Sequence, residues 1–149
     1  QSPMMTTPTP PAPYSRDNLA DVLRGHGISP THQRIEIAHA LFSRRAHLSA
    51  EQILAIVNAR SAETSKATVY NTLSLFLEKK LIREVIVDPR RVFYDPTTAP
   101  HHHFYNVDTG ELTDIDVADI AVSGLPQLPE GMTTEGIDII VRIRSRQAV

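Results

Sequence analysis

The chain has 149 residues, with 15 Lys and Arg, 17 Asp and Glu, 7 His and no Cys. A composition that is 41% hydrophobic and 21% charged is typical of a globular protein, and this length predicts one ordinary domain or two small ones. The absence of cysteine excludes disulfides, thiolate nucleophiles and cysteine-held zinc, so any metal must be held by His, Asp or Glu. No apolar run approaches the roughly 20 residues that span a bilayer, and no secretory leader opens the chain, so we expect a cytoplasmic protein with no membrane partner.

Charge is divided unevenly along the chain. Residues 15–91 contain 12 Lys and Arg against 8 acids, whereas residues 92–149 contain 3 against 9. The net charge of −2 argues against a generic polycation, but a basic front half joined to an acidic back half predicts two modules with different partners.

The first half of the chain is patterned for helices. Residues 1–14 are rich in proline and predict a flexible tail. Ser15 is a suitable N-cap for a first helix, which the glycines at 25 and 27 should end. A second helix is predicted after Pro30, and the Ser49–Gln52 capping box opens a third. A fourth should begin near Ser65.

The second half changes to a strand-like period. We expect a first hairpin around the turn Asp88-Pro89-Arg90, a stiff hinge, a second hairpin around Asp108-Thr109-Gly110, an irregular segment rich in Gly and Pro, and a final strand. The expected ranges are 83–88 and 91–95 for the first hairpin, 96–100 for the hinge, 102–107 and 111–115 for the second hairpin, 123–136 for the irregular segment and 137–143 for the last strand.

Helices followed by a hairpin are typical of a winged helix-turn-helix domain, whose fourth helix would enter the major groove of DNA. We therefore predict an α+β protein with a winged-helix domain over 15–95, a hinge over 96–100 and a small α/β domain over 101–149. Arg90 and Arg91 fall at the tip of the wing, where contacts with phosphate or the minor groove occur. The alternative is a small helical domain with a solvated charged face.

The run His101-His102-His103 is the most unusual local feature. Alternation along a strand would turn His101 and His103 to one face and His102 to the other. Carboxylates lie at useful places in Asp95 and Asp114, and a further histidine lies in the front module. Three histidines and two carboxylates suit Fe, Mn or Zn, and an ion held between two modules suits a sensor. The predicted ligand set is His47, Asp95, His101, His103 and Asp114. The alternative is an exposed polar cluster without an ion.

Several segments together resemble the ferric uptake regulator family. Gly27-Ile28-Ser29-Pro30-Thr31-His32-Gln33-Arg34 is similar to its opening motif, His47-Leu48-Ser49-Ala50-Glu51 to its "HxSAE" segment, and Ala67-Thr68-Val69-Tyr70-Asn71-Thr72-Leu73 to its recognition helix. Arg91-Val92-Phe93-Tyr94-Asp95, the three histidines and Asp108-Thr109-Gly110-Glu111-Leu112 follow in the family's order. The resemblance covers roughly 17–120, and the cysteine-free version with three histidines most resembles the iron response regulator branch.

This resemblance implies a homodimer, or a higher oligomer, whose back half is the dimerisation domain. Its winged-helix domains would bind a pseudo-palindromic operator in double-stranded DNA. The resemblance also implies a repressor of iron and haem genes. An enzyme is not expected, since five protein ligands would leave little open coordination, whereas catalytic sites usually keep a position free. The same five residues match the family's regulatory site. The expected DNA contacts are Arg34, Lys66, Thr68, Tyr70, Asn71, Arg90 and Arg91.

The ligand expected from the resemblance is haem at His101, His102 and His103, or Fe²⁺ or Mn²⁺ at the five-residue site, with Zn²⁺ able to bind in vitro. On resemblance alone, haem should lower DNA affinity. A manganese- or peroxide-sensing regulator of the same family is the alternative. Where the family opens its structural zinc site with C-x-x-C, this chain has Asn106-Val107-Asp108-Thr109, so that zinc should be absent.

Overall fold

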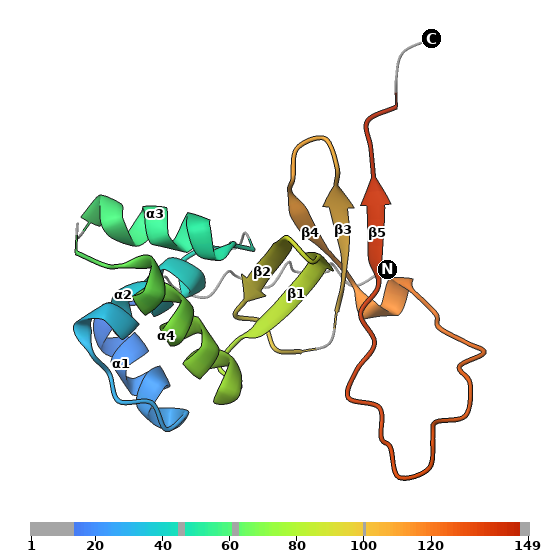
Figure 1. The fold of residues 1–149 in the computed structure, drawn as a ribbon, viewed down its shortest axis with the longest axis horizontal. Helices are drawn as coiled ribbons and strands as arrows, with labels where there is room; N and C mark the ends of the chain where they lie inside the picture. The colour runs from blue at the N-terminus through green and yellow to red at the C-terminus, as the bar shows by residue number, and fades with distance from the viewer. Residues whose placement is uncertain (1–13, 45–46, 61–62, 100, 147–149) are drawn as a thin grey trace, which may run out of the picture.

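The computed structural model describes residues 14–44, 47–60, 63–99 and 101–146. Four helices gather at one side of the molecule and two small sheets follow them, with the first sheet between the helices and the second (Figure 1). The order is α1 (Arg16–Gly25), α2 (His32–Phe42), α3 (Ala50–Arg60), α4 (Lys66–Glu78), β1 (Arg83–Asp88), β2 (Arg91–Asp95), β3 (His102–Asn106), β4 (Leu112–Ile115), a 3-10 turn η1 (Val117–Asp119) and β5 (Ile140–Ile143). The predicted α+β class is confirmed. No helix in the described ranges is both long and apolar enough to cross a membrane.

The helices begin where the capping signals place them. Ser15 accepts a hydrogen bond from the Asn18 N–H, and Ser65 accepts one from the Thr68 N–H. Ser49 and Gln52 form the predicted capping box, because each side chain accepts from the other's backbone N–H at 3.2 and 2.8 Å. These bonds satisfy N–H groups that the first turn of a helix leaves without partners.

The helices enclose one apolar core. Each contributes a buried stripe, and α4 turns Val69, Leu73 and Phe76 inward while Tyr70 and Asn71 remain exposed. This is the arrangement that helical periodicity predicts for a recognition helix supported from behind. The largest fully buried apolar side chains of this core are Leu19, Leu23, Ile37, Leu41, Ile53, Leu73 and Phe76.

The wing, formed by β1 and β2, has its own packing partner. The two strands pair antiparallel from Arg83↔Asp95 to Asp88↔Arg91. Three wing side chains join two from the second sheet in a separate apolar cluster, whose members are Val85, Val87, Phe93, Tyr105 and Leu112. The wing therefore packs on the C-terminal sheet and is not a free hairpin.

The second sheet has the order β4-β3-β5, with β3 and β4 antiparallel and β5 parallel to β3. A parallel neighbour requires a long crossover, here supplied by residues 116–139, which leave the body of the molecule as a wide loop (Figure 1). Apart from η1, this crossover is irregular and almost wholly exposed. The described part of the C-terminal domain predicted over 101–149 contains three strands and a single 3-10 turn.

Other boundaries differ modestly from expectation. The strands are shorter than the predicted ranges 102–107, 111–115 and 137–143, although β3 begins at His102 as predicted. Tyr14, placed in the predicted tail, packs its ring edge-on against Phe42 at 5.3 Å between centroids. The rest of the tail, residues 1–13, and Pro100 of the predicted hinge lie outside the described residues.

Candidate metal centre and DNA interface

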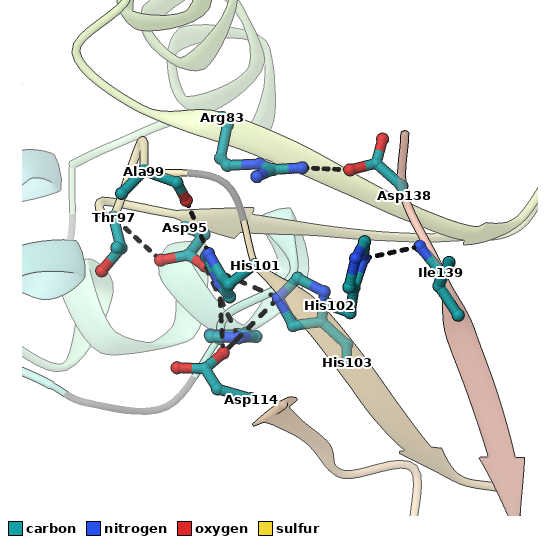
Figure 2. Close-up of polar contacts among 11 residues, drawn as sticks. Arg83, Asp95, Thr97, Ala99, His101, His102, His103, Asp114, Asp138 and Ile139 are labelled. Atoms are coloured by element: carbon teal, nitrogen blue, oxygen red, sulfur yellow. Dashed lines mark hydrogen bonds and ion pairs between the residues drawn. The ribbon is translucent and has the colours of Figure 1, made fainter. Parts of the chain in front are cut away.

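All five predicted ligand residues come together in one place. One donor atom from each of His47, Asp95, His101, His103 and Asp114 lies within 4.8 Å of every other. Figure 2 shows Asp95, His101, His103 and Asp114 converging, with β2 on one side and the second sheet on the other. We call these five residues the His/Asp cluster. Their ligand role remains a prediction, whereas their convergence is a property of the fold.

A single β-bridge places His47 beside Asp95. Leu48 and Tyr94 pair antiparallel, the Tyr94 N–H donating to the Leu48 carbonyl at 2.7 Å and the Leu48 N–H to the Tyr94 carbonyl at 3.4 Å. Since His47 precedes one partner and Asp95 follows the other, the bridge sets them opposite each other. Their nearest N and O atoms are 3.6 Å apart. The helical module thus contributes one residue to the cluster, His47, from the segment just before α3.

The second sheet and the residue just before it contribute three members, His101, His103 and Asp114, and Asp95 ends the wing strand β2. His103 and Asp114 are directly paired across β3 and β4, so their side chains share one face. His101 lies just before β3, and its Nδ1 is 2.8 Å from the Ala99 carbonyl. An Nδ1–H donated to that carbonyl leaves the Nε2 lone pair free for a metal. His101 Nε2 lies 2.8 Å from Asp95 and 3.2 Å from Asp114.

Asp95 is buried but charged. Burial alone would raise the pKa of its carboxyl, but His103, the Thr97 N–H and the nearby His47 and His101 together lower that pKa to about 2. The Thr97 N–H donates to Oδ1 at 2.8 Å, which leaves Oδ2 directed at the histidines. A buried carboxylate needs compensating partners because desolvation of a lone charge is costly. The backbone and three imidazoles supply them here.

The donor set fits a divalent cation. Both ring nitrogens of the fully buried His103 lack a hydrogen-bond partner, and buried polar atoms without partners are rare. A metal binds neutral imidazoles, and with the two carboxylates such a site carries a charge of −2, which a divalent ion balances. A cavity of about 330 Å³ opens onto His47, Asp95 and Asp114 and provides an entry path. Nitrogen and oxygen donors of this kind suit Mn²⁺, Fe²⁺ and Zn²⁺.

His102 is turned away from the cluster, as strand alternation predicts. Its Nδ1 accepts a hydrogen bond from the Ile139 N–H at 3.1 Å, which joins β3 to the segment before β5 (Figure 2). The three consecutive histidines therefore do not act as one group. The expected haem contact at His101, His102 and His103 finds no support in this arrangement, which aims two of the rings at Asp95 and Asp114 and the third at the backbone.

The predicted base-reading residues lie on the exposed side of α4. Lys66 and Asn71 are exposed and Thr68 is half-buried. Tyr70 is 38% exposed, and its hydroxyl donates to Glu51 of α3 at 2.9 Å, while the Lys66 ammonium lies 5.8 Å from its ring centroid. The contact with Glu51 raises the pKa of Tyr70 and holds its ring at the edge of the helix. This face is suited to a major groove.

The three arginines predicted to contact DNA differ in their exposure and in their hydrogen bonds within the protein. Arg34 is partly exposed and donates to the Ser29 carbonyl at 2.9 Å, which keeps it near the start of α2. Arg90 is exposed, and in the described part of the chain its side chain has no hydrogen-bond or ion-pair partner. Arg91 instead reaches the Tyr105 hydroxyl in the second sheet, so it is the least available of the three for DNA.

Sequence reasoning missed the residues that assemble these sites. Leu48 and Tyr94 form the bridge beside the cluster, and Tyr105 binds the wing. Tyr105 lies two residues after His103, so strand alternation could have placed it on the face of β3 that meets the wing. No local signal marks the Leu48–Tyr94 bridge, because its partners are far apart in the sequence.

The sequence and the fold were also compared with those of known proteins. The sequence profile of the ferric uptake regulator family matches residues 25–141. The peroxide operon regulator of Bacillus subtilis (strain 168) is 30% identical over 103 residues, which are 69% of this chain and 71% of that protein. The ferric uptake regulator of Pseudomonas aeruginosa with manganese has a TM-score of 0.64 at 23% identity, over 85% of this chain and 97% of that one. The regulator of Francisella tularensis with iron has a TM-score of 0.65 at 20% identity, over 80% and 93%.

Proposed function

The chain belongs to the ferric uptake regulator family, and we propose that it is a transcription repressor whose DNA affinity is set by a divalent metal at the His/Asp cluster. Proteins of this family are dimeric DNA-binding regulators and not enzymes. The observation that carries the proposal is the convergence of five donor atoms from both halves of the molecule, with buried His103 nitrogens that lack any other partner.

The physical link between metal and DNA is the position of the cluster. His47 belongs to the helical module, Asp95 ends the wing, and the other three residues belong to the second sheet or its approach. An ion bound by all of them restrains the angle between the two modules. A ligand shifts DNA affinity only through its different affinity for the arrangements that do and do not fit DNA. The cluster is placed to supply that difference.

The DNA-binding surface combines α4 and the arginines around it. In this proposal Thr68, Tyr70 and Asn71 contact base edges, while Lys66, Arg34 and Arg90 contact phosphates. Phosphate contacts by Lys and Arg make binding weaker as salt rises. A homodimer would present two such surfaces to a pseudo-palindromic operator, with half-sites one helical turn or a multiple apart.

The main experiment measures metal and DNA binding on matched variants. Calorimetry with Mn²⁺, and with Fe²⁺ under anaerobic conditions, should show binding to the wild type and a loss of about 100-fold or more for His103→Ala. His102→Ala is the matched control, because it removes an adjacent histidine that points away from the cluster. Fluorescence anisotropy on operator DNA should show a metal-dependent change in affinity for the wild type and for His102→Ala only. Equal metal affinity in all three proteins would refute the proposal.

The proposed function takes different forms according to the ligand, which is either a metal ion or haem. We favour Fe²⁺ or Mn²⁺ over haem, because the cluster presents carboxylates as well as imidazoles and His102 is engaged by the backbone. An absorption titration with haem on the wild type and on a His101→Ala/His103→Ala variant tests the iron- and haem-regulatory version. A haem spectrum that disappears in the double variant would reverse this preference.

Peroxide sensing is a second candidate function, favoured by the 30% identity to a peroxide operon regulator. In this version Fe²⁺ in the same cluster promotes oxidation of His47 or His101. Peroxide treatment of the iron-loaded protein should then add about 16 Da to a peptide that contains one of these residues, because one oxygen atom is inserted. An unchanged mass with iron, together with normal metal-dependent DNA binding, would leave simple metal sensing.

A further inference from the structure

The wing strand β2 and the sensing strand β3 are not hydrogen-bonded to each other, because they belong to different sheets. They meet only through side chains. Arg91, Phe93 and Asp95 alternate along β2 and so share a face, as do His103 and Tyr105 on β3. The packing between the two strands is therefore one row of side chains against another.

The two ends of this row carry different contacts. At one end Asp95 Oδ2 lies 2.8 Å from His101 Nε2 and 3.8 Å from His103 Nε2. In the middle the rings of Phe93 and Tyr105 are 6.4 Å apart. At the other end Arg91 donates to the Tyr105 hydroxyl, with its guanidinium carbon 5.6 Å from the centroid of the same ring.

The Arg91–Tyr105 contact is therefore a second polar contact between β2 and β3, in addition to that of Asp95 with the histidines. Tyr105 is 3% exposed, so its position is fixed by packing, and Arg91 is held both by a hydrogen bond and above the aromatic ring. Such a contact needs no metal. It aligns β2 on β3 in the position that brings Asp95 among the histidines, four residues further along the same strand.

We propose that Tyr105 and Arg91 are positioning residues for the metal centre, which hold β2 so that Asp95 is in place before an ion binds. This rests on the proposed metal-sensing function. It also gives Arg91 a role inside the protein in place of the phosphate contact that the sequence suggests. Preorganisation of a ligand set raises affinity because the cost of ordering it has been met before binding.

The test is a double-mutant cycle on the full chain, with the dissociation constant for Mn²⁺ as the readout. Tyr105→Phe removes only the hydroxyl, and Arg91→Ala removes the guanidinium; each should weaken Mn²⁺ binding by about tenfold. The double variant should lose no more than Arg91→Ala alone, because that variant already removes both the hydrogen bond to the Tyr105 hydroxyl and the contact above its ring. Arg91→Lys should not restore affinity, since an ammonium lacks the planar group that lies over the ring. Arg24→Ala, which removes an exposed arginine of α1, is the control.

The outcomes separate this inference from the function on which it rests. A wild type that binds no Mn²⁺ contradicts the proposed function itself. A wild type that binds, with Tyr105→Phe binding equally well, contradicts only the positioning role. Losses that multiply in the double variant would indicate general loosening and would also overturn it. So would an Arg91→Ala variant that loses DNA affinity without metal while its Mn²⁺ affinity is unchanged. Thermal unfolding of the metal-free proteins confirms that each variant is folded.

Discussion

The helical module and the C-terminal sheet are built in different ways. The helices are capped by their own side chains and enclose a core that all four share. Among the described residues, the second sheet contributes the buried Tyr105 and Leu112, with Ile140 partly buried against them, to a cluster whose other buried members come from the wing. The C-terminal half therefore depends on the DNA-binding half for its apolar packing. Neither the apolar cluster under the second sheet nor the His/Asp cluster is complete without the wing, so the position of the wing affects both.

The largest expected effects come from substitutions in the two apolar cores. Phe76→Ala should destabilise the helical core by about 4 kcal/mol, and Phe93→Ala should destabilise the wing cluster by about 3 kcal/mol. Only Phe93→Ala should also weaken metal binding in the protein that remains folded, because Phe93 lies between Arg91 and Asp95 on β2. Chemical denaturation followed by Mn²⁺ calorimetry measures both quantities. Equal effects on metal affinity would mean that the cores are not distinct.

Metal binding should stabilise the folded protein, because the His/Asp cluster joins its two halves. At a free metal concentration roughly 100 times the dissociation constant, the free energy of unfolding should rise by about 2.7 kcal/mol, because the folded state alone assembles the cluster. Denaturation curves with and without Mn²⁺ measure the rise. His103→Ala should show none of it, and a rise of the same size in that variant would place the stabilising ion elsewhere.

The turn between β3 and β4 is tied by side-chain hydrogen bonds to its own backbone and to the segment after β5. Asn106 accepts from the backbone N–H groups of Asp108 and Thr109, and Asp108 accepts from the Ser145 N–H at 2.9 Å, beyond β5. Asp108→Ala should therefore cost about 1 kcal/mol by freeing the segment after β5. Hydrogen exchange at Ser145 and denaturation midpoints provide the measurement. Treatment of the metal-free protein with chelator should leave these values unchanged, since no cysteine-held zinc braces this turn.

The smallest expected effect lies in the helical module. Arg16 on α1 pairs with Glu36 on α2 through two hydrogen bonds, and this pairing lowers the pKa of Glu36 below its ordinary value of 4.5. A lowered folded-state pKa adds stability above the unfolded value and loses it as pH falls through the folded value. Glu36→Gln should cost about 0.5 kcal/mol at neutral pH, since Arg16 is partly exposed, and nothing in strongly acidic buffer. Denaturation at both pH values tests the sign.

Much of the helical module could be predicted because its signals are local. Ser15, Ser49 and Ser65 mark helix starts through bonds made within three residues, and the apolar period marks the buried faces. The wing followed from Asp88-Pro89-Arg90 between two β-rich runs, and its bounds are those predicted. The C-terminal domain was less predictable, since residues 116–139 carry apolar side chains that no local period organises into a helix.

The sequence by itself determined which residues could bind a metal. Residue type identifies the histidines and the carboxylates, and strand alternation places His101 and His103 on one face and His102 on the other. Tertiary structure alone decided that His47 lies beside Asp95, because the Leu48–Tyr94 bridge joins segments about half a domain apart in sequence. It also decided that Arg91 of the wing donates a hydrogen bond to Tyr105 of the second sheet. Both outcomes depend on packing between separate elements, whose free energy no local pattern encodes.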